Sequence, residues 1–416
     1  MKEKRDKINR RIFLKTAGAV GLGSVLADSS TAGESGPANK PGRNEQAKAG
    51  QDKFPQVPRR KLGKTGVEVP CLSLGANRLN NQVILRAAFR WGVTYWDTAN
   101  SYVGGNSEIN IGKFIAKNPE ARKKLFIVTK ASGAKSVAEV EQRLATSLER
   151  LNTDYIDLYY GVHGLDEPEQ LTAELGRWVK KAKERKVIRF FGFSTHKNMA
   201  GNLSAAAKLD WVDAIMTTYN FRVMQDEKMQ AAVEACHKAG IGIIAMKTLG
   251  VRTKTKVETE ADKKLVAHFL NKGFTEMQAK IKAVLSDKRI TSACVGMSNI
   301  AEITENAGAV VDKTKLTRQD MQVLSEYAGA TRAGYCAGCA DICAAAARVP
   351  HINDVMRCLM YYNGYGEHDM ARERFANIAG SVRSRLERAD YRLAEVRCPQ
   401  RLPIAKLVAE AVTKLA

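Results

Sequence analysis

The chain has 416 residues, of which 44% are hydrophobic and 26% charged, and its formal net charge is +22. This length and composition support a sizeable folded core, and they exclude a wholly disordered or collagen-like protein. No uninterrupted apolar run reaches the ~18–20 residues of a membrane-spanning helix, so we do not expect an integral membrane protein.

The first 32 residues have the order of elements of an export signal. A basic segment with the pair Arg10-Arg11 leads into the weakly apolar stretch Thr16–Ala27, and small residues follow at 30–32. This order predicts a twin-arginine (Tat) signal peptide over residues 1–32, with the Tat machinery as a partner and the periplasm or cell envelope as destination. A basic amphipathic helix is the alternative. Residues 33–56 show no apolar periodicity, which predicts a linker.

Eight short apolar runs recur between residues 57 and 330, most of them at the spacing of βα units. Strands that are apolar throughout suit a parallel sheet covered on both faces, so we expect an α/β fold, a (β/α)8 TIM barrel. An open doubly wound sheet is the competitor, but no G-x-G-x-x-G follows the first strand. Residues 57–70 contain a Gly-punctuated turn, which predicts a hairpin at the barrel bottom. The runs are Cys71–Gly75, Val93–Asp97, Lys124–Lys130, Tyr155–Val162, Ile188–Phe193, Ala214–Tyr219, Ile241–Met246 and Ala293–Met297.

Four polar side chains stand at the ends of three neighbouring strands, where a barrel carries its active site. Asp97 and Tyr102 follow the second run, Lys130 ends the third, and His163 follows the fourth. An ammonium group lowers the pKa of a nearby phenol, so Lys130, held by Asp97, would make Tyr102 a usable proton donor. His163 would orient a substrate carbonyl, whose oxygen Tyr102 protonates as hydride arrives from a nicotinamide. Each residue alone is more often structural, but the set predicts a catalytic site.

These residues belong to a longer series of motifs. The series comprises Arg60-Lys61-Leu62-Gly63-Lys64-Thr65-Gly66, Asp97…Tyr102, Glu108-Ile109-Asn110-Ile111-Gly112, Lys130, His163, Gly192-Phe193-Ser194, Tyr219-Asn220 and Gly296-Met297-Ser298-Asn299…Glu305-Asn306. In this series the chain resembles the aldo/keto reductase family over residues 57–312. The resemblance implies a barrel, NADPH or NADH bound without a Rossmann motif, and reversible reduction of a small carbonyl substrate to an alcohol. It also places Asp97, Tyr102, Lys130 and His163 on the family's catalytic tetrad.

The resemblance carries over less cleanly to the nicotinamide contacts. It places Ser194 at the nicotinamide amide, but Thr195 replaces the usual Asn and Met216 stands where a Gln often serves. Met246 and Lys247 occupy the segment that commonly supplies a ring-stacking Tyr and a Ser. A Met can still pack on an aromatic face, and Lys247 would meet the pyrophosphate.

The last motif would hold the adenosine end of the cofactor. Glu302 stands where the family often has an Arg for the 2′-phosphate, which favours NAD(H) over NADP(H). The helix that opens near Ser298 would offer backbone N–H groups to an anion. The cofactor-binding candidates in this motif are Gly296, Ser298, Asn299, Glu302, Glu305 and Asn306.

Residues 331–416 carry a cysteine cluster and are predicted to form a helical extension of the barrel. Cys336, Cys339 and Cys343 have C-x2-C-x3-C spacing, and Cys398 precedes a proline. This pattern resembles ferredoxin-type ligation of one [4Fe–4S] cluster, although Ala344 stands where a ferredoxin has Pro. A zinc site, disulfides and a decayed cluster site are the alternatives. The other thiols, those of Cys71, Cys236, Cys294 and Cys358, are expected to be packing residues.

Two functions of different classes remain open. The first is an exported NAD- or NADP-dependent oxidoreductase with an accessory iron–sulfur cluster, and the tetrad favours it. The second is a non-catalytic nucleotide-binding barrel that acts as a redox sensor or assembly subunit, and the altered cofactor contacts keep it open. Because no free nicotinamide pool is expected outside the cytoplasm, either the cofactor travels inside the protein or turnover needs another electron route, for which the cluster and an electron-transfer partner are candidates. Nucleic-acid binding is not expected, since no basic-aromatic motif is present.

Overall fold

The structure is a computed structural model that describes residues 54–251, 259–339 and 342–416. The predicted export signal and most of the predicted linker lie outside the described residues. The chain from Pro55 to Ala416 forms one compact unit. Among the described residues, no helix combines the length and apolar character needed to cross a bilayer.

Eight parallel strands close into a barrel in the order β10-β3-β4-β5-β6-β7-β8-β9, which confirms the predicted (β/α)8 fold. The barrel closes where the last strand pairs with the first, with Ala293 opposite Leu72. Each predicted apolar run overlaps a strand; β10 begins three residues before its run, and β6 and β7 end one and two residues after theirs. The strands are β3 (Leu72–Gly75), β4 (Tyr95–Asp97), β5 (Phe126–Lys130), β6 (Ile156–His163), β7 (Ile188–Thr195), β8 (Ala214–Thr218), β9 (Gly242–Met246) and β10 (Ile290–Gly296).

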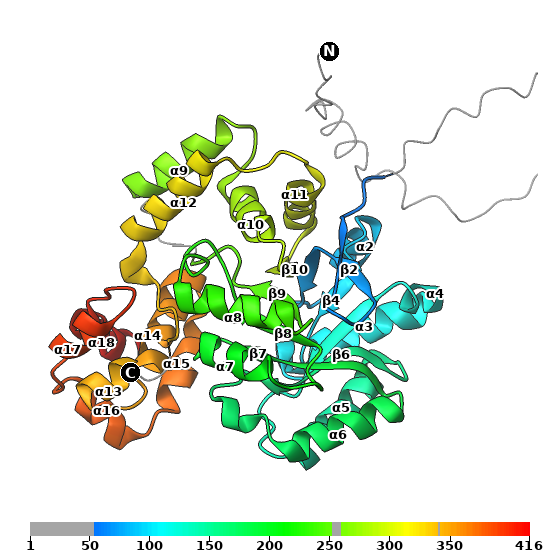
Figure 1. Cartoon of the computed structure of the whole chain (residues 1–416), viewed down its shortest axis with the longest axis horizontal. Coiled ribbons are helices and arrows are strands. Elements are labelled where there is room, and N and C mark those ends of the chain that lie inside the picture. Colours follow the sequence, from blue (N-terminus) through cyan, green and yellow to red (C-terminus); the bar gives the residue numbers. More distant parts are fainter. Residues whose placement is uncertain (1–53, 252–258, 340–341) are drawn as a thin grey trace, which may run out of the picture. The chain divides into compact units, whose positions relative to one another are not determined.

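Amphipathic helices surround the barrel (Figure 1). Helix α5 illustrates why they form: Ser136 caps its N-terminus by accepting from the N–H of Glu139, and Val140, Leu144 and Leu151 bury one face. The helices are α2 (Val83–Arg90), α3 (Asn106–Lys117), α4 (Pro119–Arg122), α5 (Val137–Leu151), α6 (Ala173–Glu184), α7 (Met199–Ala206), α8 (Glu227–Lys238), α9 (Glu260–Leu270), α10 (Glu276–Ser286), α11 (Ile300–Val311) and α12 (Arg318–Ala330), with the short helices η1 (Tyr102–Gly105) and η2 (Pro168–Gln170).

A two-stranded hairpin closes the amino-terminal end of the barrel, as predicted. Its strands β1 (Arg59–Lys61) and β2 (Glu68–Pro70) are antiparallel, and Leu62 and Val69 join the apolar core inside the barrel. The absence of a side chain at Gly63 allows the hairpin to pack closely against the backbone of Gly240. A Cβ at Gly63 would lie 2.2 Å from the carbonyl oxygen of Gly240, and its φ of +52° is left-handed.

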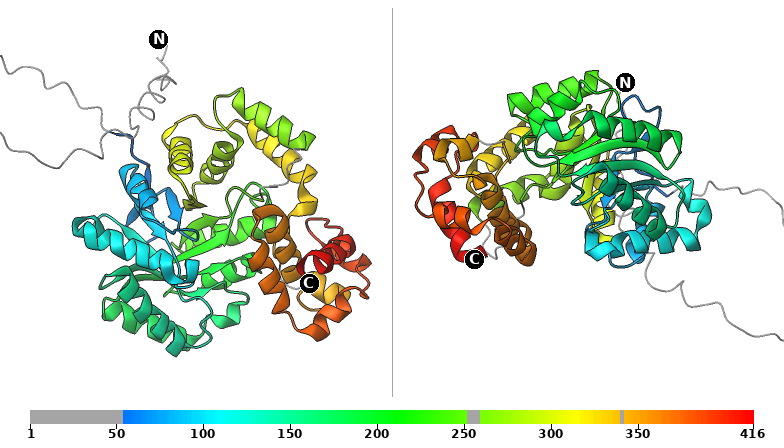
Figure 2. Two further views of the ribbon diagram at one scale, coloured as in Figure 1. Left: turned by 180° about the vertical axis from the view of Figure 1, so that it is seen from behind. Right: turned by 90° about the horizontal axis from the view of Figure 1, so that it is seen from below.

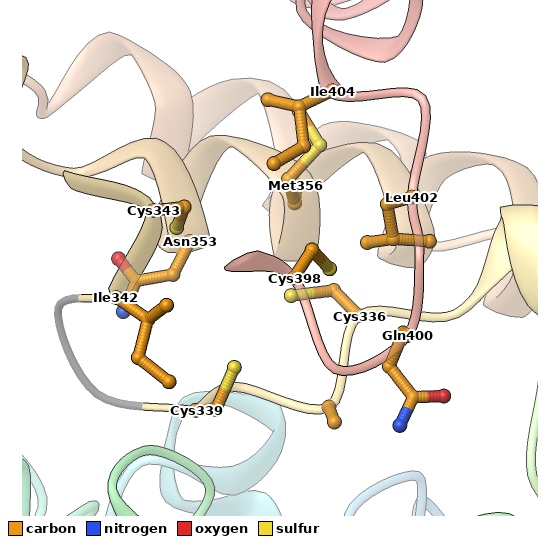
Figure 3. Close-up of a pocket in the computed structure, with 11 residues that line it drawn as sticks. Cys336, Cys339, Ile342, Cys343, Asn353, Met356, Cys398, Gln400, Leu402 and Ile404 are labelled. Carbon is orange, nitrogen blue, oxygen red and sulfur yellow. The ribbon is translucent and has the colours of Figure 1, made fainter. Parts of the chain in front are cut away.

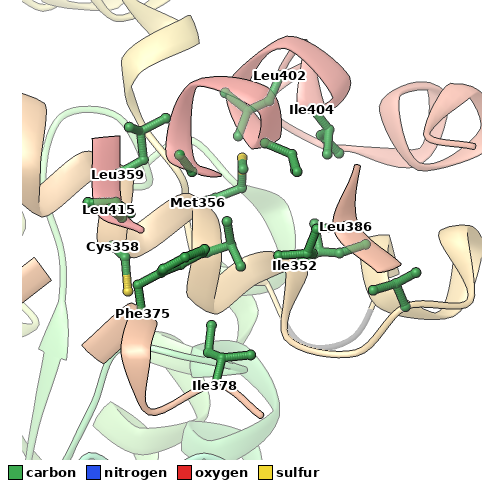
Figure 4. Close-up of a cluster of buried hydrophobic side chains, with 14 of the residues drawn as sticks. Ile352, Met356, Cys358, Leu359, Phe375, Ile378, Leu386, Leu402, Ile404 and Leu415 are labelled. Atoms are coloured by element: carbon green, nitrogen blue, oxygen red, sulfur yellow. The ribbon is translucent and has the colours of Figure 1, made fainter. Parts of the chain in front are cut away.

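The carboxy-terminal residues form the predicted helical extension, which has its own apolar core. Phe375, Ile352 and Leu386 are buried in this core, and Figure 4 shows the helices that supply its side chains. Cys358 is also buried there, in agreement with its predicted packing role. The elements are η3 (Arg332–Gly334), α13 (Ile342–Ala347), α14 (Ile352–Met360), η4 (Tyr361–Tyr365), α15 (His368–Ala376), α16 (Gly380–Leu386), α17 (Arg392–Arg397) and α18 (Ile404–Leu415).

The extension contacts the loops that follow the carboxyl ends of several barrel strands. Beyond β7, the N–H of Asn198 donates to the carbonyl of Gly338 at 2.9 Å. Beyond β8, Nδ2 of Asn220 donates to the Tyr335 hydroxyl at 3.1 Å. Beyond β3, Arg78 forms an ion pair with a glutamate at the start of α15. The extension therefore packs at the end of the barrel where the candidate site lies (Figure 2).

Candidate active site

The closed barrel brings the four predicted catalytic residues to the carboxyl ends of adjacent strands. Asp97 ends β4, Lys130 ends β5 and His163 ends β6, while Tyr102 opens η1 just after β4. These strands pair in parallel, with Asp97 opposite Val128 and Lys130 opposite Tyr160, so their carboxyl ends meet at the same end of the barrel. Val103, next to Tyr102, has a left-handed φ of 52°, which is costly for a β-branched residue. The backbone that presents Tyr102 is therefore strained.

Asp97 and Lys130 form a buried ion pair at the centre of the site. Lys130 Nζ lies 2.5 Å from Asp97 Oδ1, and the two side chains are 1% and 3% exposed. Lys130 Nζ also donates to the backbone carbonyl of Thr98 at 2.7 Å. These contacts fix the position of the ammonium group. The second carboxylate oxygen, Oδ2 of Asp97, has no hydrogen-bond partner among the described residues.

Tyr102 lies against both Lys130 and His163. Nζ of Lys130 is 4.8 Å from the centroid of the phenol ring, and the rings of Tyr102 and His163 meet edge-to-face at 5.9 Å. Burial raises the pKa of Tyr102 above its ordinary value, and the charge of Lys130 offsets only part of this effect. The net direction differs from the lowering expected from sequence, because the pattern did not show how deeply the phenol is buried. The phenol is therefore protonated and ready to donate.

His163 is held as a neutral imidazole. Burial, together with the positive charges of Lys130 and Arg374, lowers its pKa to about 3. Its Nδ1 lies 2.6 Å from Oγ of Ser132, which itself accepts a hydrogen bond from Ser101. If Ser132 donates its proton to Nδ1, the imidazole proton lies on Nε2. His163 can donate a hydrogen bond to a substrate oxygen without carrying a charge.

The predicted nicotinamide contacts lie at the ends of β7, β8 and β9. Ser194 is buried, and its Oγ accepts from the N–H of Gly164 at 3.1 Å, so its own proton remains available to a ligand. Thr195 instead donates to backbone carbonyls of the protein. Met216 and Met246 are buried in the apolar core inside the barrel. Lys247 follows β9, outside that core.

The predicted adenosine contacts lie where β10 leads into α11. Asn299 caps α11 by accepting from the N–H of Glu302, and Oε2 of Glu302 accepts from the N–H of Ser298 at 2.7 Å. The protein's own carboxylate thus occupies one of the N–H groups that sequence reasoning assigned to an anion. Gly296 is exposed at the end of β10, Asn306 is buried in α11, and Glu305 accepts from the Thr275 hydroxyl.

The four cysteines predicted as ligands line one cavity in the extension. Cys336 and Cys339 come from the loop after η3, Cys343 from α13, and Cys398 from the end of α17, and Figure 3 shows them around the same space. The cavity is otherwise lined mainly by apolar side chains such as Met356. Burial raises the pKa of Cys336 to about 12 and that of Cys339 to about 11.

The spacing of these thiols bears on which metal group fits. No three or more His, Cys, Asp or Glu side chains in the described part of the chain lie close enough together to hold a metal ion. Cys336, Cys339 and Cys398 are not joined in disulfides. The four thiols line one cavity, but the described residues do not by themselves form a ligand set for a metal ion.

Sequence reasoning missed the polar residues that the extension and the loops bring to the tetrad. Ser132 follows Lys130 by two positions, and this spacing is the only signal it offered. Arg374 influences His163 although it lies on α15, far along the chain. Arg357 on α14 donates to the hydroxyl of Tyr361 at 3.2 Å, near the mouth of the barrel. Nothing in the sequence linked these arginines to the barrel.

Comparisons with known proteins agree with this geometry. The family model described as the aldo/keto reductase family matches residues 72–328. The match ends before the cysteine cluster begins. The region that carries the tetrad is therefore the region that resembles characterised proteins.

Two curated relatives and one solved structure illustrate the likeness. The L-galactose dehydrogenase of Arabidopsis thaliana is 26% identical over 296 residues, which cover 64% of this chain and 92% of that protein. The L-glyceraldehyde 3-phosphate reductase of Escherichia coli (strain K12) is 26% identical over 331 residues, 66% of this chain and 94% of that protein. The holo form of aldo-keto reductase AKR11C1 from Bacillus halodurans superposes with a TM-score of 0.54 at 21% identity, covering 65% of this chain and 96% of that one.

Proposed function

Because the chain belongs to the aldo/keto reductase family, we propose that it is a nicotinamide-dependent oxidoreductase that interconverts a small carbonyl compound and its alcohol. The observation that carries this proposal is the arrangement of Tyr102 beside the buried Asp97–Lys130 ion pair and the neutral His163. A proton donor, a fixed cation and a neutral hydrogen-bond donor meet there at one end of the barrel.

The chain's own residues supply the proton chemistry of this reaction. A bound nicotinamide would supply the hydride for reduction, or accept it in the reverse direction. Tyr102 delivers its phenolic proton to the carbonyl oxygen, and the ammonium of Lys130 stabilises the phenolate that remains. His163 donates a hydrogen bond from Nε2 to the same oxygen. A proton from solvent then restores the phenol.

The ends of β7 and β9 have donors suited to a nicotinamide cofactor. Ser194 keeps a free proton, and the hydroxyl of Thr248, just after β9, is buried without a partner among the described residues. Buried hydroxyls without partners are costly unless a ligand satisfies them. We propose NAD(H) in preference to NADP(H), because the carboxylate of Glu302 would repel a 2′-phosphate. Dissociation constants for NADH and NADPH, measured by fluorescence, would decide between them.

Replacing Tyr102 with Phe tests the proposed activity. The substitution removes only the proton donor, so carbonyl reduction should fall by a factor of 100 or more while NADH affinity stays within about threefold. Tyr155→Phe is the matched control, since Tyr155 precedes β6 at the opposite end of the barrel. The assay is NADH oxidation with a panel of aldehydes. Retention of most of the wild-type kcat by Tyr102→Phe would contradict the proposal.

We further propose that the extension holds one [4Fe–4S] cluster on Cys336, Cys339, Cys343 and Cys398. The shared cavity and its apolar lining support this assignment. A bound cluster would supply one-electron transfer, which offers a route for electrons where no free nicotinamide pool exists. The four thiols would then be deprotonated and held by iron, which overcomes the unfavourable burial of their charges.

The metal content of anaerobically purified protein tests this second proposal. Wild-type protein should be brown and carry about four irons per chain. Cys398→Ser should lose most of the iron and loosen the extension, because this ligand ties the end of α17 to the loop after η3. Cys358→Ser is the control and should keep its iron, since Cys358 lies in the apolar core of the extension. Colourless protein with about one zinc per chain, or with bridged cysteines, would refute the cluster.

Finally, we propose that the protein is exported in its folded state to the periplasm or cell envelope. The order of elements in residues 1–32 supports this, as does the need to insert a cluster in the cytoplasm before export.

A further inference from the structure

Beneath the tetrad, two tyrosines that the proposed proton transfer does not use lie inside the barrel. Tyr95 on β4 and Tyr160 on β6 are fully buried, and both belong to the apolar core inside the barrel. Neither hydroxyl has a hydrogen-bond partner among the described residues. A buried hydroxyl without a partner is costly, so two of them in one core point to a polar neighbour that they share.

The two strands direct these side chains toward the buried ion pair. Tyr95 precedes Asp97 by two positions in β4, and residues two apart in a strand share a face. Tyr160 lies opposite Lys130 in the pairing of β5 with β6, and Nζ of Lys130 is 5.9 Å from the centroid of the Tyr160 ring. Both phenols therefore lie on the inner side of the Asp97–Lys130 pair.

An irregularity in β6 allows Tyr160 and His163 to face the same site. In a regular strand, residues three apart point to opposite faces. The pairing of β6 with β7 shifts register between Tyr160 and Val162, so Gly161 is an extra residue in the strand. A Cβ at Gly161 would lie 2.4 Å from the ring of Phe191, which favours glycine at this point. The bulge thus brings the His163 ring to the site while Tyr160 stays in the core.

The carboxylate of Asp97 is the polar neighbour that both phenols share. Burial raises the pKa of Tyr95 and of Tyr160, and the charge of Asp97 adds to the rise in each, so both hydroxyls keep their protons. Oδ1 of Asp97 is paired with Lys130, whereas Oδ2 is buried and has no partner among the described residues. One acceptor and two donors therefore lie unpaired in the same part of the barrel.

We propose that Tyr95 and Tyr160 are positioning residues that hold Oδ2 of Asp97 through one buried water molecule. The water accepts a hydrogen bond from each phenol and donates one to Oδ2, and about three hydrogen bonds are typical of a buried water. Donors that reach a carboxylate favour its charged form, and the charged form keeps the ammonium of Lys130 beside Tyr102. The consequence for catalysis rests on the proposed function, but the contact with Asp97 does not.

The ionisation of Asp97 tests this contact without any substrate. Its carboxyl resonance is followed by 13C NMR in the full chain labelled at aspartate, and it is assigned by its loss in Asp97→Asn. Tyr95→Phe and Tyr160→Phe each remove one hydroxyl, and each should raise the proton affinity of Asp97 about tenfold, which is a rise of about 1 in its pKa. The other groups that face Asp97 stay the same in these variants, and they are Lys130, Tyr102 and Cys294.

Tyr159→Phe serves as the comparison for a phenol on the same strand. Tyr159 is also buried, but its hydroxyl donates to the carbonyl of Val140 at 3.0 Å, so its loss should leave the pKa of Asp97 as in wild type. Melting temperatures add an independent sign. Removal of an idle buried hydroxyl leaves stability unchanged or raises it, whereas removal of a hydroxyl that binds the water lowers the melting temperature.

The pH dependence of kcat/KM for aldehyde reduction tests the consequence for catalysis. Because protonation of Asp97 releases Lys130, the acid limb of this profile should move to higher pH in Tyr95→Phe and Tyr160→Phe, by as much as the pKa of Asp97 rises, and not in Tyr159→Phe. If wild type reduces no aldehyde while the pKa of Asp97 still responds, the proposed function fails and the positioning of Asp97 stands. An unchanged pKa of Asp97 in both variants overturns the proposal, and a rise in only one of them overturns the shared water.

Discussion

Removing the ammonium of Lys130 should destabilise the fold as well as the catalytic site. In Lys130→Met, the carboxylate of Asp97 would lose its ammonium partner, and neither of its oxygens would keep a hydrogen bond to a described residue. Breaking a buried ion pair from one side costs about 3–5 kcal/mol of unfolding free energy. The side chains are 1% and 3% exposed, so water can compensate little of this loss. Burial already raises the pKa of Asp97, and without Lys130 the carboxyl should become protonated.

A double-mutant cycle separates the pair from the individual residues. Asp97→Asn combined with Lys130→Met should be more stable than the sum of the single losses predicts, by about 1–3 kcal/mol, because no unpaired charge remains. Urea unfolding, followed by circular dichroism, measures these differences in unfolding free energy, provided that the m-value is the same for all variants. Lys123→Met is the control, since Lys123 and Glu120 are 79% and 83% exposed, and it should change stability by less than about 0.5 kcal/mol. If the losses of stability in the two single variants add up to the loss in the double variant, the coupling is refuted. The two single variants and the double variant should all lack activity.

Three other predictions concern separate parts of the chain. Changing Arg10 and Arg11 to Lys should keep the precursor in the cytoplasm, because the export receptor reads guanidinium groups, and fractionation with an immunoblot would show it. The lowered pKa of His163 means that the unfolded state binds more protons below about pH 6.5, so stability should fall as pH drops from there towards 3. The unfolding midpoint of the His163→Gln variant should change less than that of the wild type between about pH 6.5 and 3. Gly63→Ala should lower the melting temperature, because its Cβ would overlap the Gly240 carbonyl, whereas Gly329→Ala, which meets no atom within 4 Å and needs no left-handed φ, should not.

The barrel could be predicted from sequence because its strands are apolar throughout and its helices have regular apolar spacing. Val137–Leu151 is a helix over the residues that its periodicity suggests. The boundaries were less certain at β10, where Ile290–Ser292 are buried and continue the strand. The positions of the four tetrad residues followed from the rule that strand ends carry the site.

The features of the site that could not be predicted from sequence depend on contacts between distant segments of the chain. Arg357 and Arg374 approach the barrel mouth only through the packing of the extension, and no local pattern in the sequence encodes that packing. The direction of the pKa shift of Tyr102 depended on burial, which a sequence pattern does not measure. The link between Ser132 and His163 required the geometry of two adjacent strand ends.

The pairing of β3 with β10 sets the order in which this protein can fold during synthesis. The two strands come from the first and last parts of the barrel, so both present unpaired edges until residue 296 has left the ribosome. Closing so long a loop is slow, and a half-made barrel is prone to aggregation. The extension is synthesised only after the barrel can close, and its contacts at Asn198 and Asn220 form on a barrel that already exists. If the extension binds the proposed cluster, we therefore expect its insertion to be the last step, on a chain whose barrel is already complete.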